Sequence, residues 1–207
     1  MTNTDVRKLF DKNYIGLAEL KPFFENLGLD ISGIVESDIN YADADLIRAA
    51  KAGYILIYGV ERINDKRITL RLLRDILGIN PNLSEPCFYN QDWYMHEDFI
   101  DIALNNQWYL IKKEVYEDSR AVMPMDLIDR GVVFPPAILC AYAFFAYYFL
   151  NNEYLWYHDF VWCQDIDHNG DRIYVGKYND IDGINKNGFS IHRHLALRPC
   201  YASVALI

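Results

Sequence analysis

The fold is decided by FVWCQDIDHNGDRIYVGKY, residues 160–178, in which two aromatic-rich segments flank a short polar turn. Aromatic and β-branched residues at both ends are typical of strands. Asn169-Gly170 between them is the strongest short-range signal of a β-hairpin. A further aromatic segment follows the second strand. We therefore expect three consecutive strands in a C-terminal antiparallel sheet, at about 154–164, 171–178 and 188–204.

Before this region the apolar residues recur with a helical period, and glycines stand where helices would end. The sequence predicts helices at about 5–10, 17–27, 44–52 and 68–77, and strands at 54–58 and 107–116. Pro135 and Pro136 stand where a first helical turn accepts proline. The uncharged stretch that follows them ends at Leu150. We predict a buried helix there, at about 135–150.

Together these elements predict an α+β fold, in which a helical N-terminal part precedes a C-terminal antiparallel sheet packed on the buried helix. The stretch 79–95 is rich in Pro, Asn and Ser, which indicates a boundary. We expect a mainly helical subdomain at 1–80 and an α+β subdomain with the C-terminal sheet at 81–207. A single continuous domain is the alternative, since 207 residues fit either arrangement.

The composition narrows the classes of function. The net charge of −9 argues against a nucleic acid as the main partner, because affinity for phosphates comes from Lys and Arg. Residues 1–12 lack the apolar core of a signal peptide, and the proline pair leaves too short an apolar stretch for a bilayer span. We therefore expect a cytoplasmic protein without membrane contact, whose four cysteines are free thiols. In an exported chain, Cys163 and Cys200 would be the pair to bridge.

Two loops of similar chemistry follow the first two predicted strands. Their oxygen-bearing side chains are those of Asp165, Asp167, Asn169, Asp171, Asp180 and Asp182. Alternating oxygens that end in Gly170 match the first half of an EF-hand calcium loop, but Gly176 stands where the bidentate Glu belongs. Calcium bound by both loops is therefore one interpretation. The other is a hairpin turn whose Asp and Asn side chains bond their own backbone.

Two histidines lie in the third predicted strand. Because strand residues alternate between faces, His192 and His194 share one face and Arg193 lies on the other. Two imidazoles on one face can begin a transition-metal site, which His158 or His168 could join. With a nearby Asp, such a site would make the protein a metal-dependent hydrolytic enzyme. The alternative is a pair of histidines that bond carboxylates or tyrosines in a polar pocket.

The stretch 90–98 concentrates polar and aromatic side chains near the predicted boundary. Ligand-binding clefts are often lined by such a mixture. Trp93, Tyr94 and His96 are therefore candidate ligand-binding residues, together with His192 and His194. Alternatively, Trp93 and Tyr94 plug the junction between helices and sheet.

The helix predicted at 68–77 has one basic face, formed by Arg67, Arg71 and Arg74. Such a face could bind a nucleic acid or an acidic partner, although most basic faces are simply solvated. The acidic total makes a nucleic acid the weaker alternative. The sequence contains no nucleophile elbow, P-loop or dinucleotide fingerprint.

The C-terminal quarter contains five short segments of a recognisable pattern: Leu155-Trp156, Phe160–Cys163, Asp171–Gly176, Gly188–Ser190 and Leu197–Cys200. In these segments it resembles the end of C-type-lectin-like domains of the bacterial paralogous-domain and variable-protein type. Trp162-Cys163-Gln164 replaces the Trp-Ser-Ser pattern of those domains, and the sugar-binding Glu-Pro-Asn and Trp-Asn-Asp motifs are missing. The resemblance implies a fold and carries no ligand residue across. The chain is also similar to uncharacterised proteins of gut bacteria and their mobile elements.

The sequence therefore favours a non-enzymatic binding or interaction module of a bacterium or its mobile element. Its partner would be an unknown protein or a small ligand, and a homo-oligomer is compatible with the many aromatic residues. No cofactor is expected, apart from calcium in the loops at 165–182. The metal-dependent enzyme and the basic helix face are the competing hypotheses.

Overall fold

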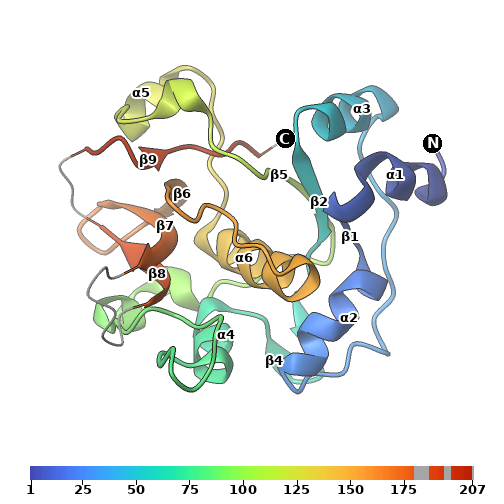
Figure 1. Cartoon of the computed structure of the whole chain (residues 1–207), viewed down its shortest axis with the longest axis horizontal. Helices are drawn as coiled ribbons and strands as arrows, with labels where there is room; N and C mark the ends of the chain where they lie inside the picture. The colour runs from blue at the N-terminus through green and yellow to red at the C-terminus, as the bar shows by residue number, and fades with distance from the viewer. Residues whose placement is uncertain (180–186, 194–196, 207) are drawn as a thin grey trace.

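The computed structural model describes residues 1–179, 187–193 and 197–206. These residues form three layers, in which one long helix lies between two β-sheets (Figure 1). The order of helices and strands confirms the α+β class. No described helix has the length and apolar character needed to cross a membrane.

The first layer is a small sheet with helices around it. Its strands are β1 (Tyr14–Ile15), β2 (Tyr54–Tyr58) and β5 (Trp108–Lys112), in the order β1-β2-β5. The middle strand β2 is buried at every position, as a run of apolar residues predicts. It pairs in parallel with β1 and antiparallel with β5, so this sheet takes strands from both sides of residue 80. The helices beside it are α1 (Asn3–Phe10), the 3₁₀ helix η1 (Asp11–Asn13), α2 (Leu17–Asn26) and α3 (Asp43–Lys51).

Short elements precede and follow β5 in the chain. They are β3 (Arg62–Ile63), β4 (Lys66–Arg67), α4 (Leu70–Leu77), the 3₁₀ helices η2 (Trp93–His96), η3 (Asp98–Asp101) and η4 (Glu117–Ser119), and α5 (Pro124–Asp129). The helix predicted to begin at Ile68 begins at Leu70, because the Thr69 hydroxyl caps it by accepting a hydrogen bond from the Leu72 amide at 3.2 Å. Arg67 therefore lies in β4 and not on the helix.

The central layer is α6 (Ala137–Asn151), the helix predicted at 135–150. Every residue from Ala137 to Tyr147 is buried, as expected for a helix that is apolar all round. The Tyr142 hydroxyl donates a hydrogen bond of 3.1 Å to the Tyr58 carbonyl in β2, which ties the helix to the first sheet. On its other side the helix shares a buried core with Val161, Ile173 and Phe189, which confirms the predicted packing of the C-terminal sheet on a buried helix.

The C-terminal sheet contains β6 (Phe160–Ile166), β7 (Arg172–Asn179), β8 (Asn187–His192) and β9 (Tyr201–Ala202) in the order β8-β7-β6-β9. The predicted hairpin joins β6 to β7. The prediction of one strand at 188–204 was wrong, because β8 pairs with β7 whereas β9 pairs in parallel with β6 at the opposite edge. The first strand begins at Phe160 and not near 154, since Trp156 adopts a φ of 50° that no strand accommodates.

The two faces of the C-terminal sheet differ in their partners. The inner face packs on α6 through Val161, Cys163, Ile173, Val175, Phe189 and Ile191. The outer face is aromatic, where Trp162, Tyr174 and Tyr201 pack with Leu127 of α5 and Phe134. Cys163 therefore lies against α6, with its sulfur 3.9 Å from that of Cys140, whereas Cys200 packs on the outer face. All four cysteines are free thiols in the structure.

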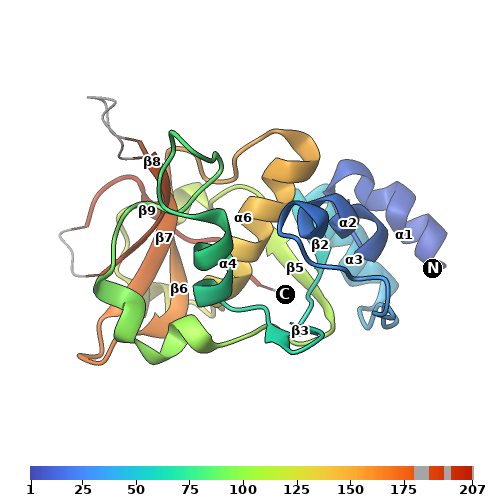
Figure 2. The same cartoon turned by 90° about the horizontal axis from the view of Figure 1, so that it is seen from below.

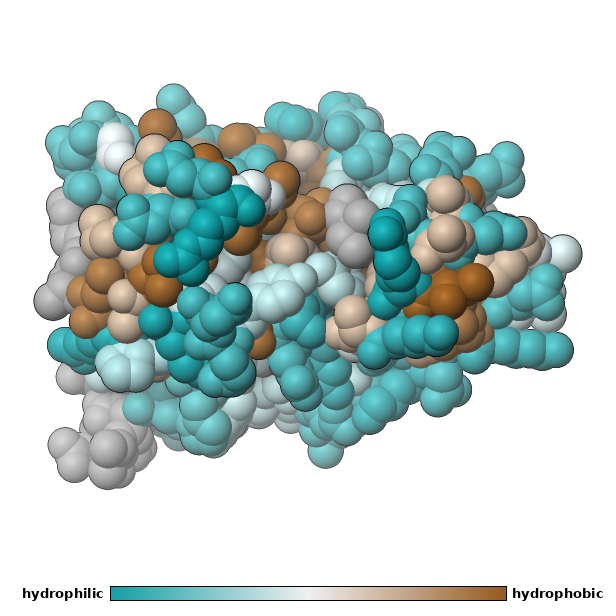
Figure 3. Space-filling model, turned by 90° about the horizontal axis from the view of Figure 1, so that it is seen from above, coloured by the Kyte–Doolittle hydropathy of each residue, from teal (hydrophilic) through white to brown (hydrophobic). Residues whose placement is uncertain are grey.

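The surface seen from above is largely hydrophilic, with apolar side chains toward its α5 end and a further apolar patch toward the opposite end (Figure 3). Near α5, Met123, Met125 and Val133 each expose more than half of their surface.

Candidate functional site

The β6–β7 hairpin lies at the end of the molecule opposite α1 (Figure 2). A hollow lies between the end of this hairpin and the 3₁₀ helices η2 and η3. Its volume is about 570 Å³, within the range of small-ligand sites. The polar residues that line it include His96, Glu97, Asp98, Asp165, Asp167 and His168. All six belong to the stretches 90–98 and 165–182, which the sequence singled out.

One wall of the hollow is held in place by β8. The 87–89 segment runs beside this strand, where the Tyr89 amide donates to the Phe189 carbonyl at 2.8 Å and the Phe189 amide donates to the Cys87 carbonyl at 2.9 Å. Further along, the Trp93 indole donates to the Ile191 carbonyl at 3.1 Å. Gly188 permits this close approach, because a Cβ atom there would lie 2.5 Å from the neighbouring backbone.

Arginines of α4 hold the same wall from the other side. Arg71 pairs with Asp101 at 2.7 Å and donates to the Met95 carbonyl at 3.1 Å. Arg74 donates to the Gln91 carbonyl at 2.8 Å. Arg71 and Arg74 are therefore partnered by their own chain. Arg67 is exposed, and it donates to the Asp101 carbonyl at 3.3 Å.

The opposite wall is the hairpin turn, whose shape depends on Asp167. One oxygen of its carboxylate accepts hydrogen bonds from the backbone amides of Asn169 (2.9 Å) and Asp171 (2.8 Å). The Gly170 amide donates to the Asp167 carbonyl at 3.0 Å, and the φ of Gly170 is 86°. These bonds are those of an Asp side chain that stabilises its own turn.

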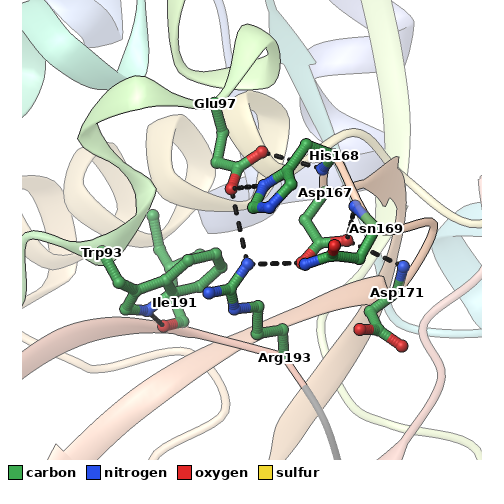
Figure 4. A network of polar contacts seen from close by, with 8 residues as sticks. All are labelled: Trp93, Glu97, Asp167, His168, Asn169, Asp171, Ile191 and Arg193. Atoms are coloured by element: carbon green, nitrogen blue, oxygen red, sulfur yellow. Dashed lines mark hydrogen bonds and ion pairs between the residues drawn. The ribbon is translucent and has the colours of Figure 1, made fainter.

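An arginine joins the two walls (Figure 4). The Arg193 guanidinium lies 2.6 Å from the second oxygen of Asp167, 3.5 Å from Glu97 and 4.4 Å from the centre of the Trp93 ring. The Asp167 side chain is fully buried. Its desolvation would raise its pKa, but the hydrogen bonds from Asp171, Arg193 and Asn169 outweigh this effect and lower the pKa of Asp167 below its ordinary value.

His168 is the exposed member of this network. Its Nδ1 donates to one oxygen of Glu97 at 2.7 Å, and its backbone amide donates to the other at 2.9 Å. The Glu97 side chain is only 5% exposed, whereas the His168 side chain is 65% exposed. A buried carboxylate thus fixes the orientation of an imidazole whose other nitrogen, Nε2, bonds no described residue. This arrangement orients histidines both in metal sites and in acid–base sites.

Glu97, Asp167 and His168 also form the one cluster of potential metal ligands among the described residues, with donor atoms within 4.8 Å of one another. An imidazole and two carboxylates are a donor set that zinc and similar ions accept. Arg193 already pairs with both carboxylates, however. A cation bound there would have to displace the guanidinium.

The candidate calcium ligands do not all lie at this turn. The Asp165 carboxylate accepts a hydrogen bond of 2.6 Å from the Ala137 amide, so it caps the N-terminus of α6. Burial raises the pKa of Asp165 above its ordinary value. Asp167, Asn169 and Asp171 belong to the turn, while Asp180 and Asp182 lie outside the described residues. Calcium binding by these loops stays a prediction.

The two candidate histidines that the structure describes, His96 and His192, lie in different surroundings. His96 is exposed and lines the hollow. His192 stacks on Tyr174 with ring centres 5.4 Å apart, and its Nε2 lies 3.0 Å from the Ser190 hydroxyl. Burial lowers the pKa of His192 to about 4. His194 lies outside the described residues.

The aromatic candidates support the wall of the hollow. Trp93 contacts β8 and Arg193, as described above, and its ring meets that of Tyr94 edge to face at 5.5 Å. Tyr94 is 1% exposed. Their packing is that of side chains that fill the junction between the 3₁₀ helices and the sheet.

Sequence reasoning missed Glu97 and Arg193 as site residues. Glu97 contacts His168 across 71 positions and Arg193 across 96, so no spacing in the sequence marks these pairs. The one available signal was the alternation of side chains along a strand, which predicts that Arg193 points to the opposite face from His192.

Comparisons with known proteins found no relative. No protein-family model matches the sequence, and searches of the curated proteins and of the solved structures found no match. The resemblance to C-type-lectin-like domains therefore stays a prediction.

Proposed function

We propose that the protein is a non-enzymatic binding module whose ligand site is the hollow between η2–η3 and the β6–β7 turn. The observation that carries this proposal is the exposed His168, which the buried Glu97 orients through both of its oxygens at 2.7 and 2.9 Å. An imidazole fixed in this way loses little side-chain entropy when a ligand binds, which favours affinity.

The lining of the hollow supports binding more than catalysis. It contains no Ser, Thr, Cys or Lys side chain among the described residues, so the usual covalent nucleophiles other than carboxylate and imidazole are missing. The Ser190–His192 pair is elsewhere, and the Ser190 side chain is fully buried. Ser190 therefore cannot meet a substrate without opening the sheet, so the pair offers no accessible hydroxyl nucleophile.

The proposal is tested with a panel of probes of different chemistry, followed by two-dimensional NMR of the ¹⁵N-labelled chain. The panel comprises hexylamine, hexanoate, glucose, inorganic phosphate, calcium chloride and zinc chloride. We expect at least one probe to shift the amide signals of residues 96–102 and 164–168. His168→Ala should weaken that binding about tenfold, the loss of roughly one charge-assisted hydrogen bond.

His158→Ala is the matched control, because His158 is also exposed but does not line the hollow. It should leave binding unchanged. If no probe shifts these signals, or if both variants weaken binding equally, the proposal is wrong. Zinc that stays bound at one ion per chain and is lost with Asp167→Asn would assign the site to a metal instead.

A further inference from the structure

The hollow is acidic where it meets solvent. Its lining carries four carboxylates, those of Glu97, Asp98, Asp165 and Asp167, and no Lys or Arg among the described residues. Three of them are buried: Arg193 offsets the charge of Glu97 and Asp167, and Asp165 accepts the Ala137 amide. Asp98 is exposed and belongs to none of the ion pairs formed by the described residues. The complementary charge on a ligand is therefore positive.

Apolar side chains face the same hollow from both walls. Ile102 follows η3 and is 45% exposed, and Ile166 ends β6 and is 54% exposed. Phe99 also lines the hollow, although it is itself buried. Each exposed isoleucine leaves apolar surface in water that a bound apolar group would cover, which is favourable by about 25 cal/mol per Å².

We infer that the hollow binds an organic cation made of an ammonium group on an aliphatic chain. This inference rests on the proposed binding function and names the class of its ligand. The ammonium group would lie toward Asp98 and the carboxylates, and the chain would cover Ile102 and Ile166. A free alkylamine and the side chain of a lysine in a peptide share this chemistry.

Calorimetric titration with a series of amines tests the inference. Butylamine, pentylamine, hexylamine and heptylamine differ by one methylene each. Burying one methylene contributes about 0.8 kcal/mol, so affinity should rise about fourfold per step until the walls are covered. Hexanoate has the length of hexylamine and the opposite charge, and it should bind at least tenfold more weakly.

Variants separate the two parts of the site. Asp98→Asn should weaken all amines by a similar factor, about threefold to tenfold, because it removes one charge interaction. Ile166→Ser should instead flatten the rise with chain length. Ile47→Ser is the matched control, since Ile47 is a 37% exposed isoleucine on α3, away from the hollow, and should change neither property.

A blocked lysine, N-acetyl-lysine methylamide, distinguishes the two sources of the ligand. Tighter binding of this compound than of butylamine assigns the site to peptides, and the reverse assigns it to free amines; either result supports the inference. Equal binding of hexanoate and hexylamine, or affinity independent of chain length, overturns it. Should the amines fail while phosphate, glucose or a divalent ion binds in a His168-dependent way, the inference falls and the proposed function stands.

Discussion

Burial of His192 should make the stability of the fold depend on pH in a range where carboxylates contribute little. In the folded chain, burial lowers the pKa of this histidine from 6.5 to about 4. The ring stacks on Tyr174 and meets Phe160 edge to face at 5.3 Å, so it is held as the neutral form. The unfolded chain exposes the same imidazole to water, where its ordinary pKa applies.

The sign of the effect follows from which state binds the proton first. As pH falls below 6.5, the unfolded chain takes up a proton that folded His192 refuses until about pH 4. The unfolded state therefore gains stability across this range, and the free energy of unfolding falls. The difference between the two pKa values corresponds to at most about 3 kcal/mol, at about 1.4 kcal/mol per pH unit.

Urea unfolding at several pH values between 7.5 and 4 measures this dependence. Replacing the histidine by an aromatic ring of similar shape, His192→Phe, removes the titration and keeps the stacking. Other groups titrate in both proteins, so their contributions cancel in the difference. The wild type should lose about 2–3 kcal/mol more than the variant between pH 7 and pH 4. Parallel curves for the two proteins, or an NMR titration of His192 with a midpoint near 6.5, would refute this reasoning.

Substitutions at three further positions, Arg193, Asp165 and Gly188, test the contacts around the hollow by chemical unfolding. Arg193→Met removes the charged partner of the buried Asp167 carboxylate, which keeps its hydrogen bonds from the amides of Asn169 and Asp171, and should cost about 1–3 kcal/mol. A loss below about 1 kcal/mol would contradict the buried ion pair. Burial raises the pKa of Asp165, so its ionisation at neutral pH lowers the stability of the fold. Asp165→Asn keeps an acceptor for the Ala137 amide and should be neutral or stabilising at pH 7. Asp165→Leu removes the acceptor and should cost about 1–3 kcal/mol. Equal losses in these two variants would argue against the capping role. Gly188→Ala forces a Cβ to 2.5 Å from neighbouring backbone and should cost about 1–3 kcal/mol, while Gly33→Ala, with open space around it, should cost far less.

Local chemistry explains what the sequence predicted well. Asn169 and Gly170 define the β6–β7 turn with residues that are adjacent in the chain. The uncharged stretch after Pro136 could only form a stable helix away from water, and α6 is buried along most of its length.

Distant pairings explain what the sequence did not predict. The residues of β8 and of β9 are both typical of strands. Their composition does not show that β8 and β9 lie at opposite edges of the sheet. The site has the same origin. The oxygen-rich loop residues suggested a cation site. In the structure the partner of Asp167 is Arg193, which also pairs with Glu97, and these two residues come from other parts of the chain.

The covering of β8 by the 87–93 segment has a consequence for how molecules of this protein meet one another. A bare strand edge offers unpaired amides and carbonyls that template the addition of strands from other chains, the first step toward amyloid. Here the outward amide and carbonyl of Phe189 are both bonded to the covering segment, and the Ile191 carbonyl is bonded to the Trp93 indole. The residues that build one wall of the hollow thereby also keep the sheet from growing between molecules.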